Sequence, residues 1–311
     1  MNHKMNKLNY TTILEEVYSQ ITPFIGEGEV ASYIPELAQI NKLQFGMSVC
    51  SNNGEEYIIG SAEKNFSIQS IAKVFSFALA YKSMGESLWK RIKREPSGSR
   101  FDSLVLLENE KGVPRNPFIN AGALVVMDVL MEVYNDPIKE ILSFIQGISG
   151  NPNIDINEKV RDSEIETGNR NYALAYYMKS YNNINSDVNK LISAYSGLCS
   201  IEMSCVDIAR SFRLFSTNGL NPWTRERFLS LSQNKRINSI LMTCGLYDAA
   251  GDFAYRVGIP AKSGVGGGIA GVIPNEMSIA VWCPALDSTG NSLAGIKALE
   301  IFTTLTGKSI Y

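Results

Sequence analysis

Histidine is almost absent from this sequence of 311 residues, in which His3 is the only one. It stands in a polar amino-terminal segment, where chain ends usually fray. An active site in this protein therefore works without imidazole, which disfavours Ser-His-Asp and Cys-His nucleophiles and the common histidine-ligated metal sites. If the protein is an enzyme, its base is a carboxylate, a lysine, a tyrosine or part of a cofactor.

An excess of charge is also missing. Lys and Arg number 29 and Asp and Glu 31, which gives a net charge of −2, and no basic patch is visible in the sequence. A phosphate backbone needs such a patch, so we expect no nucleic acid partner. No apolar run has the length of a membrane span or of a signal-peptide core, which predicts a cytoplasmic protein without a membrane partner.

Paired cysteine motifs are absent too. The five cysteines are an odd number, lie far apart and form no C-x-x-C pair, so they indicate neither a disulfide framework nor a zinc site. We expect buried, reduced thiols and no metal site. The cysteines are Cys50, Cys199, Cys205, Cys244 and Cys283.

Hydrophobic periodicity predicts strands near both ends and helices between them. This order indicates an α/β protein of the α+β type, with one antiparallel sheet built from both termini, flanked by helices, and a helical lobe. We expect a single domain, 1–311, with a sheet subdomain at about 1–65 and 245–311, a lobe at about 66–244, and a site in the cleft between them. Asp136-Pro137 and Ser204 are the predicted starts of two helices, and Asn53-Gly54 is a predicted hairpin turn. Helices are predicted at about 13–21, 121–134, 138–146, 172–179, 205–215, 227–241 and 292–305, and strands at 45–50, 57–60, 253–257, 267–273 and 277–283.

One lysine stands inside an apolar helical stretch, FSIQSIAKVFSFALA. Ser70 and Lys73 lie three residues apart and so project from the same helix face. A serine hydroxyl becomes a nucleophile when a base takes its proton, and a neutral lysine is such a base if burial lowers its pKa. Lowering a lysine pKa from about 10.4 to near 7 takes roughly 4 to 5 kcal/mol.

The S-x-x-K spacing is weak evidence alone, because Ser61 with Lys64, Ser87 with Lys90, and Ser232 with Lys235 repeat it in polar surroundings. Solvated lysines explain those three pairs. For Lys73 the alternative is a side chain that reaches from an amphipathic helix to water.

A second motif is Lys262-Ser263 followed by a glycine-rich run, GVGGG, before a predicted strand. Glycines at a strand edge let a substrate approach the backbone, and the motif offers a cation and exposed N–H donors. Lys262 could also help to keep Lys73 neutral. The alternative is a plain glycine-rich turn.

S-x-x-K early and K-S-G late resemble the penicillin-recognising serine hydrolases. More narrowly, FSIQSIAKVF, NPFINAGA, SEIETGNRNYALA, YSGLCSIEMS and LMTCGLYDAAGDFAYRVGIPAKSGVGGGI resemble the serine-dependent glutaminases of bacterial type. This resemblance covers the chain from about Gly26 onward. It implies a serine β-lactamase-like fold, a homodimer or homotetramer, and hydrolysis of L-glutamine to L-glutamate and ammonia without a cofactor.

Departures from the relatives argue against antibiotic hydrolysis. Tyr195-Ser196 is followed by Gly197 where β-lactamases carry asparagine, and the E-x-x-x-N element of one lactamase class is missing. Leu198 stands where many glutaminases have glutamine, which affects the packing behind Tyr195.

The resemblance implies that Ser70 attacks the side-chain carboxamide of glutamine with Lys73 as base. Tyr195 would pass a proton to the departing ammonia, and the N–H groups of Ser70 and Val265 would form the oxyanion hole. Whether Lys73 or Tyr195 is the base in each half-reaction stays open. The implied substrate-binding residues are Ser70, Asn120, Glu164, Asn171, Tyr195, Tyr247 and Val265, and Lys262 joins Ser70, Lys73 and Tyr195 as a catalytic residue.

Each implied residue also has a structural alternative. Asn120 and Asn171 could cap helices, Glu164 could be a surface carboxylate beside an arginine, and the two tyrosines could be core or rim aromatics. Two rival functions remain as well. One is a penicillin-binding protein or esterase, which nitrocefin hydrolysis would reveal, and the other is a silent glutamine-binding protein, which would bind glutamine with heat but release no ammonia.

Overall fold

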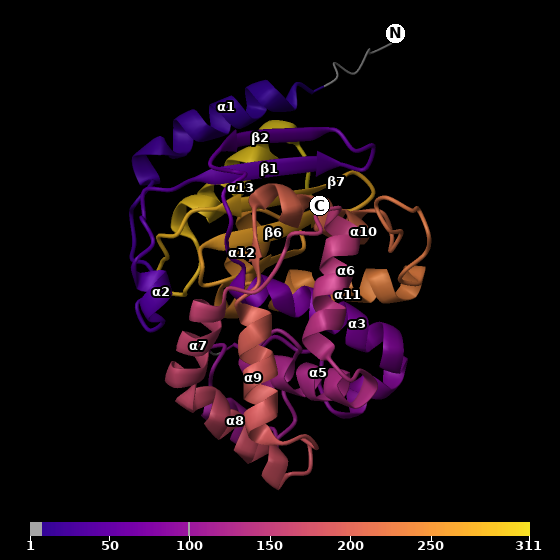
Figure 1. Cartoon of the computed structure of the whole chain (residues 1–311). Helices are drawn as coiled ribbons and strands as arrows, with labels where there is room; N and C mark the ends of the chain where they lie inside the picture. The colour runs from indigo at the N-terminus through magenta and orange to yellow at the C-terminus, as the bar shows by residue number, and fades with distance from the viewer. Residues whose placement is uncertain (1–7, 99) are drawn as a thin grey trace.

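The main sheet joins the two ends of the chain, as predicted (Figure 1). The computed structural model describes residues 8–98 and 100–311, so His3 lies outside the described residues. All neighbouring strands are antiparallel, in the order β2-β1-β7-β6-β5. The strands are β1 (Gly46–Ser51), β2 (Glu56–Gly60), β5 (Ala261–Ser263), β6 (Gly268–Ile273) and β7 (Met277–Trp282).

The central strands β6 and β7 are buried on both faces because helices cover each side of the sheet. On one side, Ile269 and Val281 pack with α1 (Tyr10–Ile21) and α13 (Leu293–Thr306). On the other side, Ala270 and Trp282 join the larger core that includes α10 (Cys205–Ser216). The alternation of side chains along each strand thus divides the residues between two cores.

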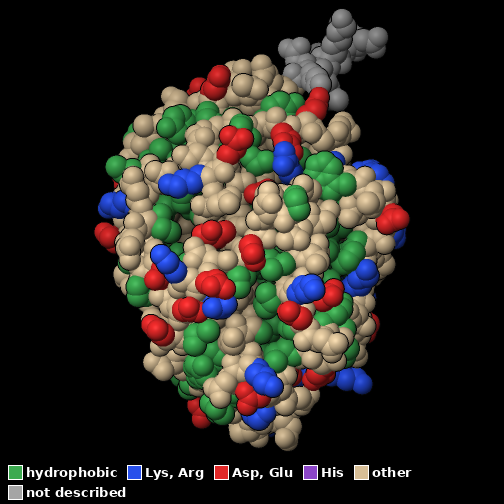
Figure 2. Space-filling view, in the orientation of Figure 1, with side chains coloured by type: hydrophobic (Ala, Val, Ile, Leu, Met, Phe, Trp, Pro, Cys, Tyr) green, Lys and Arg blue, Asp and Glu red, His purple; other side chains and the backbone are tan. Residues whose placement is uncertain are grey.

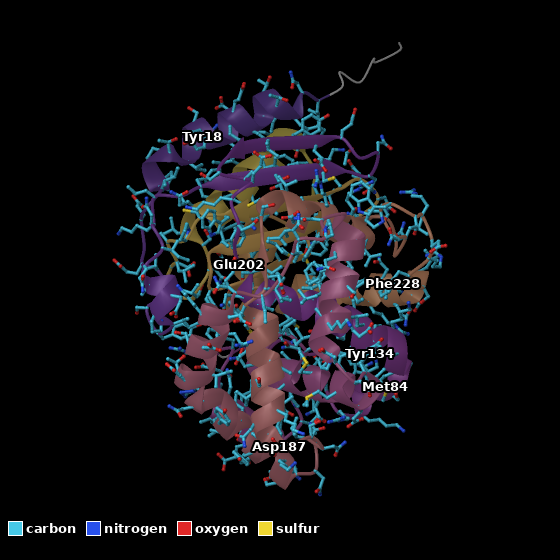
Figure 3. All side chains as sticks on the ribbon, in the orientation of Figure 1. Tyr18, Met84, Tyr134, Asp187, Glu202 and Phe228 are labelled. Carbon is cyan, nitrogen blue, oxygen red and sulfur yellow. The ribbon has the colours of Figure 1, made fainter. Side chains whose placement is uncertain are left out.

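The helical lobe lies beyond α10, and its core packs around α3. Tyr18 on α1 and Asp187 at the start of α9 lie near opposite ends of the molecule (Figure 3). The division at about residues 65 and 245 stays a prediction. The helices of this region are α3 (Ala72–Met84), α4 (Leu104–Asn109), α5 (Asn120–Val133), α6 (Pro137–Ser149), α7 (Glu158–Thr167), α8 (Asn169–Ser180), α9 (Val188–Cys199) and α11 (Leu231–Cys244).

Short elements complete the fold. A small second sheet pairs β3 (Phe66–Ser67) with β4 (Glu202–Met203), directly before the S-x-x-K segment. The remaining elements are α2 (Pro35–Ala38), α12 (Ala250–Arg256), and the 3-10 helices η1 (Thr22–Phe24), η2 (Gln69–Ile71), η3 (Gly85–Lys90) and η4 (Tyr247–Ala249).

Local capping signals define several helix starts. The Asp136 side chain accepts from the Lys139 amide ahead of α6, and Ser204 caps α10, both as the sequence predicts. The predicted helix start at residue 227 is wrong. Ser230 caps α11 in a capping box with Gln233, so the helix begins at Leu231.

The strand predicted at 253–257 is also wrong, because Phe253 lies within helix α12 and Val257 follows as its C-cap. Both side chains are buried, whereas Tyr255 between them is 90% exposed. Alternation over only five residues also satisfies the i, i+4 spacing of a helix, and Ala250 extends that buried face by three residues.

Positive and negative side chains are intermingled on the face shown in Figure 2. Across residues 8–98 and 100–311, each helix is too short or too polar to cross a bilayer.

Candidate active site

Ser70 lies in η2, immediately before α3, and faces a cavity of about 300 Å³. Three residues later, Lys73 is fully buried. The Lys73 Nζ donates hydrogen bonds to Asn120 Oδ1 at 2.7 Å and to the Phe118 carbonyl at 3.4 Å. The alternative in which Lys73 reaches solvent is therefore wrong.

The environment of Lys73 favours a neutral amine. Burial lowers the pKa of Lys73 to about 8, although the charges of Cys199 and Glu164 act in the opposite direction. The acceptors around its Nζ, an amide oxygen and a backbone carbonyl, are both uncharged. About a tenth of Lys73 is thus neutral and able to accept a proton at pH 7, and this fraction grows as the pH rises.

Lys262 is a second fully buried lysine, and it projects from β5. Its Nζ donates to the Gly245 carbonyl at 2.8 Å and to the Ser263 carbonyl at 2.7 Å, and it lies 4.2 Å from the ring centroid of Tyr247. Burial, and then the charge of Lys73, holds the pKa of Lys262 well below its ordinary value. The motif is thus a strand with a buried lysine, and the alternative of a plain turn is wrong for Lys262.

Two buried tyrosines flank these lysines. The Lys73 Nζ lies 5.7 Å from the ring centroid of Tyr195, and burial raises the pKa of Tyr195 well above its ordinary value. Burial raises the pKa of Tyr247 to about 12, while a hydrogen bond with Ser70 opposes that shift. The Tyr247 hydroxyl also lies 3.3 Å from the Ser263 carbonyl, to which it donates. Both hydroxyls stay protonated near neutral pH.

Glu164 projects from α7 into the cavity and is 7% exposed. Its Oε1 is buried without a hydrogen-bond partner among the described residues. Burial raises the pKa of Glu164 to about 7, opposed by a hydrogen bond from Gln69 and by the charge of Lys73. Glu164 is therefore a buried acceptor with free capacity, and the surface-carboxylate alternative is wrong.

Asn120 and Asn171 continue the network from Lys73. The Asn120 side-chain nitrogen donates to Asn171 Oδ1 at 3.0 Å, while its oxygen accepts from Lys73. Neither asparagine serves as a helix cap, because Ile119 precedes α5 in that position and Asn171 lies inside α8. The fold thus orients both amides by side-chain hydrogen bonds.

Six predicted residues meet in the cavity wall: Ser70, Asn120, Glu164, Asn171, Tyr195 and Val265. Lys73, Lys262 and Tyr247 are buried and do not line the wall, so Tyr247 meets Ser70 without forming part of the open surface. The sequence interpretation did not identify nine further lining residues, which are Tyr33, Gln69, Arg100, Phe101, Asp102, Thr167, Gly168, Arg170 and Cys199.

Some of these residues carry a local signal. Gln69 precedes Ser70 directly, and Cys199 lies one helical turn beyond Tyr195. Asp102 carries no local sequence signal, because folding brings it to the cavity from a segment distant from the motifs. There it forms an ion pair with Arg170, with 3.3 Å between Asp102 Oδ2 and Arg170 Nε. In the described part of the chain, no cluster of three or more His, Cys, Asp and Glu side chains could hold a metal ion.

Comparison with known proteins identifies relatives along nearly the whole chain. The family model described as Glutaminase matches residues 28–311. A glutaminase of Ralstonia nicotianae is 50% identical over 304 residues, which is 98% of this chain and 100% of that protein. A glutaminase of Aliarcobacter butzleri is 52% identical over 305 residues, again 98% of this chain and 100% of the relative.

Solved structures agree with these sequences. A probable glutaminase of Bacillus subtilis has a TM-score of 0.89 at 32% identity, covering 98% of this chain and 99% of the other. A probable glutaminase from Bacillus subtilis in complex with 6-diazo-5-oxo-L-norleucine has a TM-score of 0.88 at 32% identity, with 99% of each chain covered. The fold is that of the serine β-lactamase-like proteins, as predicted. The chain belongs to the glutaminase family.

Proposed function

We propose that the protein hydrolyses L-glutamine to L-glutamate and ammonia through a γ-glutamyl ester on Ser70. The observation that carries this proposal is the fully buried Lys73 three residues from a serine that faces the cavity, with its pKa lowered to about 8. Family membership supports glutamine as the substrate, and the geometry supports Ser70 as the nucleophile and Lys73 as the base.

In the first half-reaction, the neutral Lys73 takes the Ser70 hydroxyl proton while Ser70 Oγ attacks the side-chain carbonyl carbon of glutamine. The N–H groups of Ser70 and Val265 stabilise the negative oxygen of the tetrahedral intermediate. Collapse of this intermediate breaks the C–N bond. The proton on Lys73 reaches the leaving nitrogen through Tyr195, so ammonia departs and the γ-glutamyl ester remains.

In the second half-reaction, water attacks the ester carbonyl and loses a proton to Lys73 or Tyr195. The second tetrahedral intermediate then breaks the bond to Ser70 Oγ, which regains a proton. The products are L-glutamate and the free enzyme. Every atom comes from glutamine, water and the chain, so the steps as written need no cofactor.

The carboxylate of Glu164 in the cavity wall would select a free amino acid, because it can pair with the α-ammonium group. We infer that Glu164 accepts the α-ammonium group, because its Oε1 has no hydrogen-bond partner within the described residues. A bound cation favours the ionised carboxylate and so lowers the raised pKa of Glu164. Asn120 and Asn171, which line the wall, would hold other polar groups of the substrate by hydrogen bonds, whereas Tyr247 lies behind the wall and would act through its contact with Ser70.

Labelling with 6-diazo-5-oxo-L-norleucine tests the nucleophile. The diazo carbon takes a proton and loses N₂ as Ser70 Oγ forms a bond to it, so the adduct has the mass of the inhibitor minus N₂. Intact-mass and peptide mass spectrometry should place this adduct on Ser70. No adduct should form in Ser70→Ala, whereas Ser87→Ala, the same change in an exposed S-x-x-K motif, should be labelled fully. Labelling at another residue would refute the mechanism.

Two finer predictions rest on the family resemblance and are proposed on that basis. The protein would act in the cytoplasm, and it would assemble as a homodimer or homotetramer. Light scattering after size-exclusion chromatography gives the assembly mass directly, and a monomer at assay concentration would contradict the second prediction.

A further inference from the structure

Three alternate glycines of the K-S-G segment face the chain that carries Ser70. A Cβ atom on Gly264 would lie 2.5 Å from the Ile68 carbonyl oxygen, and one on Gly266 would lie 2.3 Å from the Ser67 carbonyl oxygen. A Cβ on Gly268 would lie 2.7 Å from the Phe66 ring. Any larger residue would push the two segments apart. We call this contact between residues 264–268 and 66–70 the glycine seam.

Trp282 ties the two sides of the glycine seam together. Its Nε1 donates a hydrogen bond to the Gly266 carbonyl at 2.9 Å. Its ring stacks on Phe66, with centroids 4.8 Å apart and an interplanar angle of 3°. The side chain is 1% exposed and projects from the end of β7, a central strand. One buried side chain thus contacts both segments, the first through a backbone carbonyl and the second through an aromatic ring.

The glycine seam places two amides beside the cavity. Val265 lies in the turn between Gly264 and Gly266, and both Val265 and Ser70 line the cavity wall. Among the described residues, no hydrogen bond from the Val265 amide is found, so this donor remains available to a ligand. A Cβ on Gly264 would also lie 3.2 Å from the Ser70 nitrogen, which shows how closely the two segments approach.

We propose that Trp282 is a positioning residue, which through the glycine seam fixes the separation of the Ser70 and Val265 N–H groups. This inference rests on the proposed function, because those amides act only if Ser70 is the nucleophile. An oxyanion forms only during the reaction, so a shifted Val265 amide lowers kcat more than it weakens ground-state binding.

Trp282→Phe tests the hydrogen bond, since it keeps an aromatic ring against Phe66 but removes the indole donor. Trp223→Phe is the matched control, because Trp223 Nε1 also donates to a backbone carbonyl at 2.9 Å, that of Ile148. We expect kcat to fall about tenfold in Trp282→Phe, a fraction of the loss of a whole oxyanion donor. KM and the calorimetric Kd of L-glutamate should stay within about twofold, and Trp223→Phe should match wild type.

Gly266→Ala tests the glycine seam without altering Trp282, and it decides the question if Trp282→Phe does not fold. We expect kcat to fall by about a hundredfold, as for a misplacement on the order of 1 Å. Gly147→Ala is its control, because a Cβ there meets nothing within 4 Å.

Normal kcat in a folded Gly266→Ala, or equal kcat in the two tryptophan variants, would overturn the inference. Ser70→Ala separates the two failures. If it is inactive, the proposed function stands and only the positioning role has failed. If Ser70→Ala still releases ammonia, the proposed function itself has failed.

Discussion

The chain contains four serine–lysine pairs at the same spacing, and they lie in two kinds of environment. Lys73 is fully buried, whereas Lys64, Lys90 and Lys235 are exposed, as the sequence predicts. The shared spacing places each serine near its lysine, but burial at Lys73 alone removes the water that stabilises an ammonium ion. Environment, more than motif, thus makes one pair suitable for catalysis.

The partners and pKa shifts of the buried lysines, Lys73 and Lys262, also differ from those of the buried carboxylate Asp128. The Asp128 carboxylate pairs with Arg91 and accepts from the Ser186 amide at 2.8 Å, and these contacts hold its pKa below its ordinary value despite burial. The two lysines instead donate to neutral oxygens, and their pKa values are lowered. By linkage, ionised Asp128 adds to stability at neutral pH, whereas burial of the two lysines lowers it; for Lys73 we propose that this instability is retained because the residue acts as a base.

The largest expected effect is that of Lys73→Met. Loss of the base should lower kcat by about 10³-fold, within the range for general acid–base catalysis. Lys90→Met makes the same change at an exposed position and should leave kcat within about twofold. Steady-state ammonia release measures both, and a loss below about tenfold in Lys73→Met would assign the base to another residue.

Glu164→Gln should come next. Without its partner the α-ammonium binds poorly, and kcat/KM for L-glutamine should fall about a hundredfold, chiefly through KM. Glu158→Gln is the matched control, because Glu158 begins the same helix with an exposed side chain, and this variant should have little effect. If KM is unchanged in Glu164→Gln, the ammonium lies elsewhere.

The change of wild-type activity with pH should be smaller than the effects of these two substitutions, but it reports directly on the base. Lys73 acts only when neutral, and its pKa is about 8, so kcat/KM should rise as the pH increases towards and through 8. The neutral fraction grows about tenfold between pH 7 and pH 9. A stopped assay at constant ionic strength gives the profile, and activity that falls over this interval would contradict a lysine base.

Replacement of Lys73 should lower activity but raise the free energy of unfolding at neutral pH. The pKa of Lys73 is about 8 in the folded state, against 10.5 for an unperturbed lysine, so the unfolded chain binds the proton more tightly. The free energy of unfolding of wild type should therefore rise as the pH increases from about 8 to 10.5. Lys73→Met should therefore be more stable than wild type at pH 7, and this advantage should shrink by about pH 9.5. Urea unfolding of both proteins measures it. A constant difference would mean that Lys73 is not buried.

Local patterns in the sequence were sufficient for much of the fold. Asp136-Pro137, Ser204 and Asn53-Gly54 predict two helix starts and a hairpin because each acts within a few residues. The alternation of residues 253–257 failed because a five-residue pattern fits a helix as well as a strand.

Two motifs and the family resemblance predicted part of the cavity wall, and the resemblance alone supplied Asn120, Glu164 and Asn171. Ser70 and Lys73 follow from spacing and an apolar context, whereas Tyr33 and Asp102 reach the cavity through the packing of distant segments. Trp282 acts on a backbone carbonyl 16 residues away, a contact that no sequence pattern encodes.

Ammonia release from L-glutamine by the four serine variants tests the central claim most directly. Ser70→Ala should lose all measurable turnover, while Ser61→Ala, Ser87→Ala and Ser232→Ala should keep the wild-type rate. Turnover by a folded Ser70→Ala, or loss of turnover in an exposed pair, would show that burial does not select the catalytic serine.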